Sequence, residues 1–198
     1  MEDVMKNLVK YIVIAASVLG STKGIAADKW YTSAFGGVNY DVNSSDTITM
    51  DPGFIAGITA GRQLNPHLRC EGELSYRENH GHASSYSGYL KVNKSHYQAN
   101  AMVNGLLDIL PGNFVNPYVG FGVGGSVSQE NESVTEGYAS GINSSEYNTL
   151  WGVSGQEIVG FRISPMKRAD IGAEYRHTHL ISFKKPSNSI AANFKVRF

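Results

Sequence analysis

The stretch Leu68–Arg77 reads L-R-C-E-G-E-L-S-Y-R and carries the clearest structural signal in the chain. Every second residue from Leu68 onward is apolar or small, and the residues between them are nearly all charged. Strict alternation over this length predicts a β-strand with one face in apolar surroundings and the other in polar surroundings. The polar face carries Arg69, Glu71, Glu73, Ser75 and Arg77.

The same alternation recurs along the chain and predicts eight strands in all. The first, Trp30–Tyr40, has mixed faces, so its phase stays open. In the segment Leu150–Ser164, Glu157 falls on the apolar face, and we expect a β-bulge there. The other predicted strands are Phe54–Gly61, Tyr97–Ile109, Pro117–Ser128, Ala169–Arg176 and Ser189–Phe198.

The connections between these segments alternate in length. The short ones each contain a proline and cover Leu64–His67, Leu110–Asn116 and Ser164–Arg168. Alternating long and short connections are typical of an up-and-down barrel whose two ends face different compartments. The long connections are rich in Ser, Asn, Gly and Lys and cover Asp41–Asp51, Glu78–Ser95, Gln129–Tyr147 and Thr178–Asn188.

Residues 1–27 have the pattern of a signal peptide. Lys6 and Lys10 precede a short apolar run, Tyr11–Leu19, which small residues follow. We expect cleavage after Ala27, with Ala26 as the other position that fits the small-residue rule. Residues 28–198 then form a single barrel domain, because no linker or change in composition divides them.

Composition limits the possible classes of protein. Charged residues make up 17% of the chain, against about 25% in ordinary globular domains. The formal net charge is zero, so we expect no nucleic-acid partner. The single cysteine, Cys70, cannot form an internal disulfide.

Alternation alone fits both a soluble barrel with an apolar interior and a membrane barrel with a polar interior. Three features favour the membrane: a signal peptide without disulfide cysteines, aromatic residues at both ends of the strands, and an alternating last strand that ends on Phe198. The sequence therefore predicts an all-β fold, an eight-stranded antiparallel up-and-down transmembrane β-barrel in the bacterial outer membrane, with extracellular loops. The charges expected inside the barrel are Arg69, Glu71, Glu73, Arg77, Asp108, Arg162, Asp170, Glu174, Arg176, Lys195 and Arg197.

The chain end N-F-K-V-R-F resembles the assembly signal of outer-membrane barrels, with Phe194, Val196 and Phe198 on one face. The whole mature chain is similar to the small OmpA-like, opacity-type barrel family, which includes porin-like proteins and surface antigens of host-associated Gram-negative bacteria. The matching stretches are W-Y-T-S-A-F-G-G, G-R-Q-L-N-P-H-L-R-C-E-G-E-L-S-Y-R, N-P-Y-V-G-F-G-V-G-G and A-D-I-G-A-E-Y-R.

Two kinds of chemistry are alternatives to a purely structural role of the charged and histidine residues. Inward charges could line a narrow channel, but an eight-stranded barrel is only wide enough for side chains to fill it, so a salt-bridge network is favoured. Four candidate residues lie near the last long connection: His177, His179, Ser182 and Ser187. An outer-membrane lipid A hydrolase would have His-x-Ser there. Here the spacing is His179-x-x-Ser182, and no acid follows before Phe198.

We therefore predict a protein that is not an enzyme and that holds no cofactor or metal, since His80 and His82 are too few for a closed site. The predicted role is a surface-exposed anchor, adhesion or structural envelope protein that acts through four external loops. A narrow porin-like channel is the alternative. The partners expected are outer-membrane lipid and lipopolysaccharide, the barrel assembly machinery, and host surface molecules.

Overall fold

The computed structural model describes residues 29–41, 49–84, 90–136, 144–166, 168–180 and 185–198. The predicted signal peptide, including Ala27, lies outside these ranges. Among the described residues, no helix has the length and apolar character needed to cross a membrane. The strands are β1 Trp30–Asp41, β2 Thr49–Met50, β3 Gly53–Gln63, β4 Leu68–Ser84, β5 Leu90–Asp108, β6 Val115–Glu136, β7 Ser144–Met166, β8 Ala169–Leu180 and β9 Lys185–Arg197.

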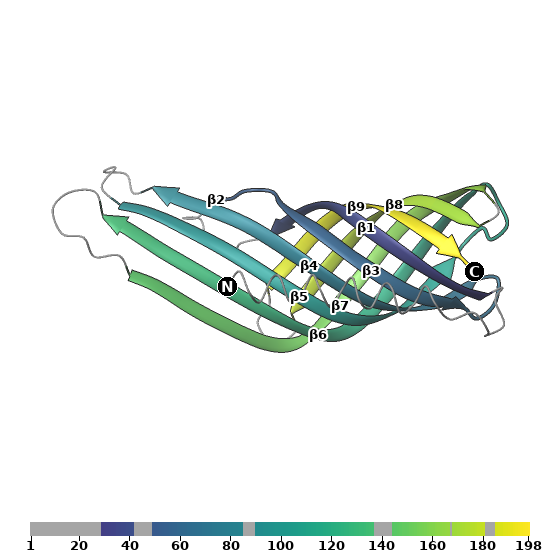
Figure 1. Ribbon diagram of the computed structural model, residues 1–198, viewed down its shortest axis with the longest axis horizontal. Coiled ribbons are helices and arrows are strands. Elements are labelled where there is room, and N and C mark those ends of the chain that lie inside the picture. The colour runs from purple at the N-terminus through teal and green to yellow at the C-terminus, as the bar shows by residue number, and fades with distance from the viewer. Residues whose placement is uncertain (1–28, 42–48, 85–89, 137–143, 167, 181–184) are drawn as a thin grey trace.

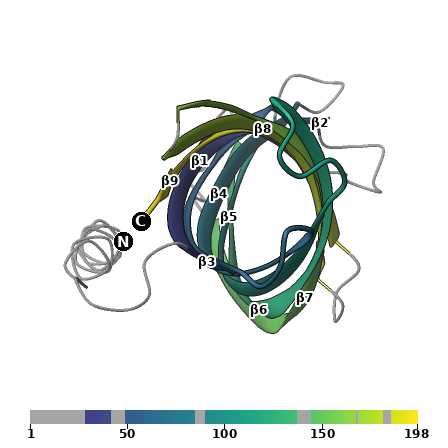
Figure 2. The same ribbon diagram turned by 90° about the vertical axis from the view of Figure 1, so that its right-hand side faces the viewer.

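The eight long strands form one closed, antiparallel ring. Each pairs with its neighbour in the chain, β4 pairs with β5, and β9 pairs with β1. Seen end-on, the strands enclose a single lumen (Figure 2). The two-residue β2 adds only a short ladder to β4, where Thr49 lies opposite His82. The predicted eight-stranded up-and-down barrel is confirmed.

The strands are strongly staggered around the ring. A ladder of directly paired residues that starts at Tyr31 returns to β1 at Asp41, ten residues further along the strand. A stagger of this size in eight strands corresponds to a tilt of about 40° and leaves an interior that side chains can fill. The ladder passes through Gly61, Glu71, Asn104, Gly122, Gln156, Thr178 and Ser187.

Most apolar side chains face outward and most polar side chains face the lumen, although a few apolar ones, such as Ile55, Leu106 and Ile158, are buried inside. The phase left open for the first strand is set by Tyr31, Phe35 and Asn39, which are buried inside. The outward side chains form an apolar belt whose exposed members include Leu74, Val103, Val119, Phe121, Val123, Val153, Val159, Ile171, Ile190 and Phe194.

Aromatic residues border this belt at both ends. We call the end with the short connections and the C-terminus the turn end, and the opposite end the loop end. Trp30, Phe161 and Phe198 are exposed toward the turn end, and Tyr40 and Trp151 toward the loop end. Two aromatic girdles around an apolar belt are typical of transmembrane barrels.

Two of the predicted long loops are mainly strand. Four strands, β4 to β7, continue beyond β1, β8 and β9 at the loop end (Figure 1). Their ladders run on until Ser84 pairs with Lys91, and Val134 with Ser144. The alternation ends before these ladders do, because both faces of the upper strands are polar.

The bulge predicted at Glu157 is wrong. The β6–β7 ladder is continuous through the pair Phe121 and Glu157, and the register shift in the β7–β8 ladder lies between Ile163 and Met166. Ser154 and Gln156 are fully buried in the lumen. An unbroken period of two therefore turns Glu157 outward, onto the apolar face.

Candidate functional site: the lumen and the projecting sheet

The charged residues that the sequence places inside the barrel are packed there in layers. In the turn-end half of the lumen, Arg69 lies between two carboxylates, 2.8 Å from Glu71 and 3.1 Å from Asp108. Arg162 Nη2 lies 2.8 Å from Asp108 Oδ2. Asp108 and Arg69 are almost completely buried, so opposite charges compensate each other in this layer.

A second pair closes the turn end itself. Arg197 forms an ion pair with Asp170, and its Nη2 also donates to Ser164 Oγ at 3.1 Å. Ser164 Oγ in turn donates to Asp170 Oδ1 at 2.7 Å. Lys195 lies slightly deeper, 3.9 Å from Glu71 and above the ring of Tyr31.

The centre of the lumen is built around Arg176 on β8. Its Nη1 lies 2.6 Å from Glu73 Oε2, and its Nε donates to Glu174 Oε1 at 2.7 Å. The guanidinium also lies 4.0 Å from the centroid of the Phe35 ring. Glu73 Oε2 accepts further hydrogen bonds from Asn104 and Gln156.

Glu73 has a different partner from the one its position along the chain suggests. The bases nearest to Glu73 along its own strand are Arg69 and Arg77. Its partner is Arg176 on β8, across the lumen from β4. A long guanidinium side chain can cross so narrow a barrel. Arg77 instead donates to Thr178 Oγ1 at 2.7 Å, nearer the loop end.

The turn-end half of the lumen holds little empty space among the described residues. A cavity there has a volume of about 10 Å³ and is lined by residues that include Arg69, Glu71, Arg176 and Lys195. That volume is close to the minimum for one water molecule. In the part of the chain that the structure describes, charged and amide side chains occupy the interior from the Asp170 layer up to Asn39 and Asn79.

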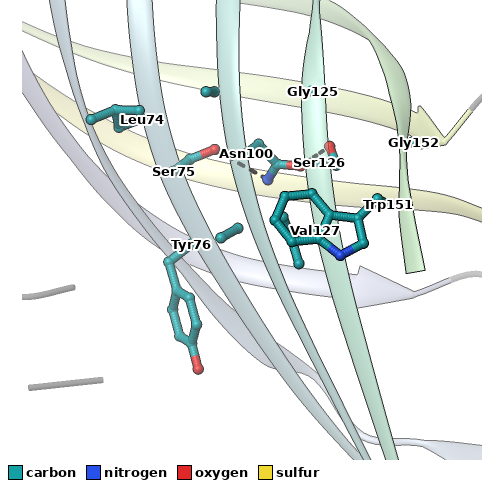
Figure 3. A pocket seen from close by; sticks show the side chains of 11 residues that line it. Leu74, Ser75, Tyr76, Asn100, Gly125, Ser126, Val127, Trp151 and Gly152 are labelled. Atoms are coloured by element: carbon teal, nitrogen blue, oxygen red, sulfur yellow. Dashed lines mark hydrogen bonds between the residues drawn. The ribbon is translucent and has the colours of Figure 1, made fainter. Parts of the chain in front are cut away.

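A larger hollow lies on the outer wall. It measures about 520 Å³ and lies between Tyr76 and Trp151, over the small residues Ala101 and Gly125 (Figure 3). The wall behind it is sealed by the lumen hydrogen bond from Ser126 Oγ to Asn100 Oδ1. A hollow of about 410 Å³ adjoins it and shares Leu74 and Ala101. Both hollows belong to the apolar belt.

The extensions of β4 to β7 form a curved sheet above the belt, which we call the projecting sheet (residues 78–84, 90–97, 129–136 and 144–149). Its described side chains are polar. Lys94 Nζ lies 3.4 Å from Glu130, and His96 contacts Ser128 Oγ at 2.6 Å. His80 contacts both Glu78 and Ser95. The contacts of Lys94 with Glu130, His96 with Ser128, and His80 with Ser95 cross between strands and tie the sheet together.

The structure does not assemble the residues considered for hydrolase chemistry. His177 lies on the outer face, whereas Ser187 is buried in the lumen and donates to Asn39. Ser182 and the side chain of His82 lie outside the described residues. No group of three or more potential metal-ligating side chains occurs within the described ranges.

Sequence reasoning missed one group of polar residues, on the outer face near Glu157. Tyr175 OH donates to Asn188 Oδ1 at 2.8 Å, and His177 Nδ1 lies 2.7 Å from the same oxygen. Glu157 lies directly opposite His177 on the adjacent strand. The signal was present, because Glu157 broke the alternation, but a bulge explained it equally well.

Closed geometry, an apolar belt with aromatic borders and a charged interior define a transmembrane β-barrel. The family model for the outer membrane protein beta-barrel domain matches residues 12–198, and the chain belongs to this family. It is thus a protein of the bacterial outer membrane. No sequence among the curated proteins matches it.

Solved structures of similar fold support this assignment. Neisserial surface protein A is 18% identical with a TM-score of 0.51, over 85% of this chain and 97% of that one. The attachment invasion locus protein Ail of Yersinia pestis, solved with the heparin analogue sucrose octasulfate, is 13% identical with a TM-score of 0.51. That match covers 87% of this chain and 99% of Ail. At these identities the likeness concerns the fold.

Proposed function

We propose that this protein is a surface anchor that presents the projecting sheet outside the cell. The barrel fixes the chain in the outer membrane, and the loop end faces outward. Binding surfaces commonly lie on segments that a rigid scaffold positions. Here the presented surface is the continuation of four strands of the barrel, β4 to β7.

The observation that carries this proposal is the height of the projecting sheet. Trp151 of the loop-end girdle pairs with Val127, and β6 continues in its ladder as far as Val134, opposite Ser144. The ten residues from Val127 to Glu136 extend for roughly 30 Å along the strand, which is a rise of roughly 23 Å at the tilt of about 40°. We infer that a sheet of this height reaches the lipopolysaccharide headgroup layer.

Two further observations support an adhesive role over transport. A cavity among the described side chains in the turn-end half of the lumen measures only about 10 Å³, which favours a plug over a channel. Ail, which shares the fold, is named for attachment and was solved with a sulfated saccharide. We propose that the projecting sheet makes contacts of this adhesive kind, with lipopolysaccharide or host surface molecules.

The test shortens one hairpin of the sheet. Residues 131–147 are replaced by Asn-Gly, which joins the directly paired Glu130 and Asn148 through a two-residue turn. The matched variant replaces 81–94 by Asn-Gly and joins His80 to Ser95. Adherence of expressing bacteria to epithelial cells and to immobilised heparin is measured at equal outer-membrane levels.

We expect at least one of the two shortened variants to lower adherence to the level of cells without the protein. Unchanged adherence in both variants would overturn the anchor proposal. Purified protein in planar bilayers should show no discrete conductance steps, and regular steps would favour the channel instead. The mass of lipid A should be the same with and without expression, because we propose no catalytic role.

A further inference from the structure

Five polar residues lie together on the outer wall of the barrel, where the rest of the belt is apolar. They are contributed by β7, β8 and β9, and Glu157 and Tyr175 are the most exposed. The anchor role uses none of them. We call this group the outer polar cluster, and its members are Glu157, Tyr175, His177, His179 and Asn188.

The cluster lies at the depth of the acyl chains. Trp151 and Phe161 belong to opposite girdles on the outer face of β7, ten residues apart. At a tilt of about 40°, ten residues rise roughly 25 Å, which is the height of the apolar band of outer-membrane barrels. Glu157 is four residues from Phe161, so it lies about 10 Å from the turn-end girdle. Val153 and Val159 flank it and are exposed.

The two histidines and Tyr175 of the cluster are held in place by contacts, and the carboxylate of Glu157 is not. His177 and Tyr175 both contact Asn188 Oδ1. The His179 ring lies against the wall over Gly155, since a Cβ there would come within 2.7 Å of Nε2. Within the described part of the chain, no hydrogen bond or ion pair reaches the Glu157 carboxylate, although His177 is its direct neighbour on β8.

An acid at this depth requires a partner. Ionisable side chains in the bilayer core are costly and are found paired with one another or turned toward protein. Lipid contact itself demands no polar group, because the wall on the far side of the ring presents Leu74 and Val103. The outer polar cluster therefore marks a surface that protein covers.

We propose that the outer polar cluster is the interface with a second copy of this chain in the membrane. Both copies insert in the same orientation, so the two-fold axis of a symmetric pair runs along the membrane normal. An axis between β7 and β8 brings Glu157 of each copy opposite His177 of the other. The dimer then contains two contacts between a Glu157 carboxylate and a His177 ring, which makes the surface self-complementary.

Small residues beside the axis permit close approach. Ala173 lies on the outer face of β8, four residues from His177 toward the turn end, and Gly155 lies beside Glu157 on β7. Small residues at interfaces let membrane segments pack closely, and polar side chains can then hydrogen-bond across the contact. The pair would leave both projecting sheets free at the loop end.

The native cysteine supplies a matched control for cross-linking. Cys70 is exposed on the outer face of β4, four strands from β8 in either direction around the ring. Three full-length proteins are compared in outer membranes under mild oxidation: the unaltered chain, Cys70→Ala with Ala173→Cys, and Cys70→Ala with Val159→Cys. We expect a disulfide-linked dimer from Ala173→Cys or Val159→Cys and only monomer from the unaltered chain.

The cluster itself is tested by adding Glu157→Leu or His177→Leu to the cross-linking variants. Each change replaces a polar group by one that lipid tolerates, so the barrel should still fold, and the dimer yield should fall about tenfold.

The proposal would be overturned if both cysteine variants stayed monomeric while folded, if Cys70 cross-linked equally well, or if Glu157→Leu left the yield unchanged. A cross-link to a chain of another size would identify a different protein as the occupant. A dimer that formed in lipopolysaccharide membranes but not in phosphatidylcholine vesicles would identify lipid as the bridging group, and either result would also overturn it.

Discussion

Arg176 illustrates what a narrow lumen demands of a charged residue. Its side chain is 2% exposed and is enclosed by Glu73, Glu174 and the ring of Phe35. A buried cation without compensating charge would cost several kcal/mol. Two carboxylates and an aromatic face supply that compensation, and the same logic holds for Arg69 between Glu71 and Asp108.

Replacing Glu73 by alanine should therefore destabilise the barrel strongly. The change removes the acceptor of three donors and leaves Arg176 with Glu174 alone, and breaking a buried pair costs about 3–5 kcal/mol. Glu73→Gln keeps the shape and one acceptor oxygen and should cost less. Urea unfolding in lipid vesicles measures both. Equal unfolding midpoints for Glu73→Ala and the unaltered protein would contradict the layered network.

On the outward face of the barrel, introducing a charge should be destabilising, whereas in the lumen removing one is. Leu74 is exposed on β4 near the middle of the apolar belt, and an arginine there should cost about 2–4 kcal/mol in a bilayer. Leu64 lies in the turn between β3 and β4, so Leu64→Arg should cost about 0–1 kcal/mol. The free energy of unfolding in vesicles separates the two. Equal costs would show that the belt does not face lipid.

At the scale of the strand, alternation of apolar and polar residues predicts only the part of each strand that has lipid on one face and the lumen on the other. The sequence predicted β8 and β9 to within a few residues, because lipid and lumen impose opposite polarity on their two faces. It missed the upper part of β6, Gln129–Glu136, where both faces are polar and no period of two survives. The register of the strands could not be predicted from the sequence either, because the contact between Glu73 and Arg176 depends on the stagger of the whole ring.

The projecting part of β6 and β7 should be removable without loss of the barrel. Exchanging residues 131–147 for Asn-Gly leaves the β6–β7 ladder intact from Asn116 and Arg162 up to Glu130 and Asn148. That remaining ladder contains all the lipid-facing pairs. We expect an unchanged heat-shifted gel band and cooperative unfolding. A protease-sensitive, unshifted band would mean that the hairpin nucleates or supports the barrel.

At the scale of the whole molecule, the stability of the barrel in lipid depends on closing the ring of strands. A barrel in lipid can leave no strand edge unpaired, because no water reaches the acyl region to satisfy backbone groups. β1 and β9, from opposite ends of the described chain, make the closing ladder from Tyr31 and Arg197 to Asp41 and Ser187. In Figure 1 the C-terminus lies beside the start of β1, at the turn end.

Phe198 directly follows the closing strand β9 (Lys185–Arg197), and its deletion tests how the ring is formed. Its backbone N–H donates to Trp30 O at 3.1 Å, and its ring is exposed at the turn-end girdle with Phe194 further up the same face. One lost backbone hydrogen bond contributes only about 1 kcal/mol, which is too little to unfold a barrel once it is formed. A purely structural role for Phe198 therefore predicts near-normal levels in the outer membrane.

A role for Phe194, Val196 and Phe198 as the signal that the assembly machinery recognises predicts a much larger effect. Deletion of Phe198 should then leave a periplasmic, protease-sensitive chain with little heat-modifiable protein in the outer membrane. Phe198→Tyr keeps a ring at the same place and serves as the control, with near-normal assembly expected. The deleted protein should still refold in detergent, because closure of β1 on β9 needs only the remaining ladder. Normal outer-membrane levels after deletion would refute the assembly signal.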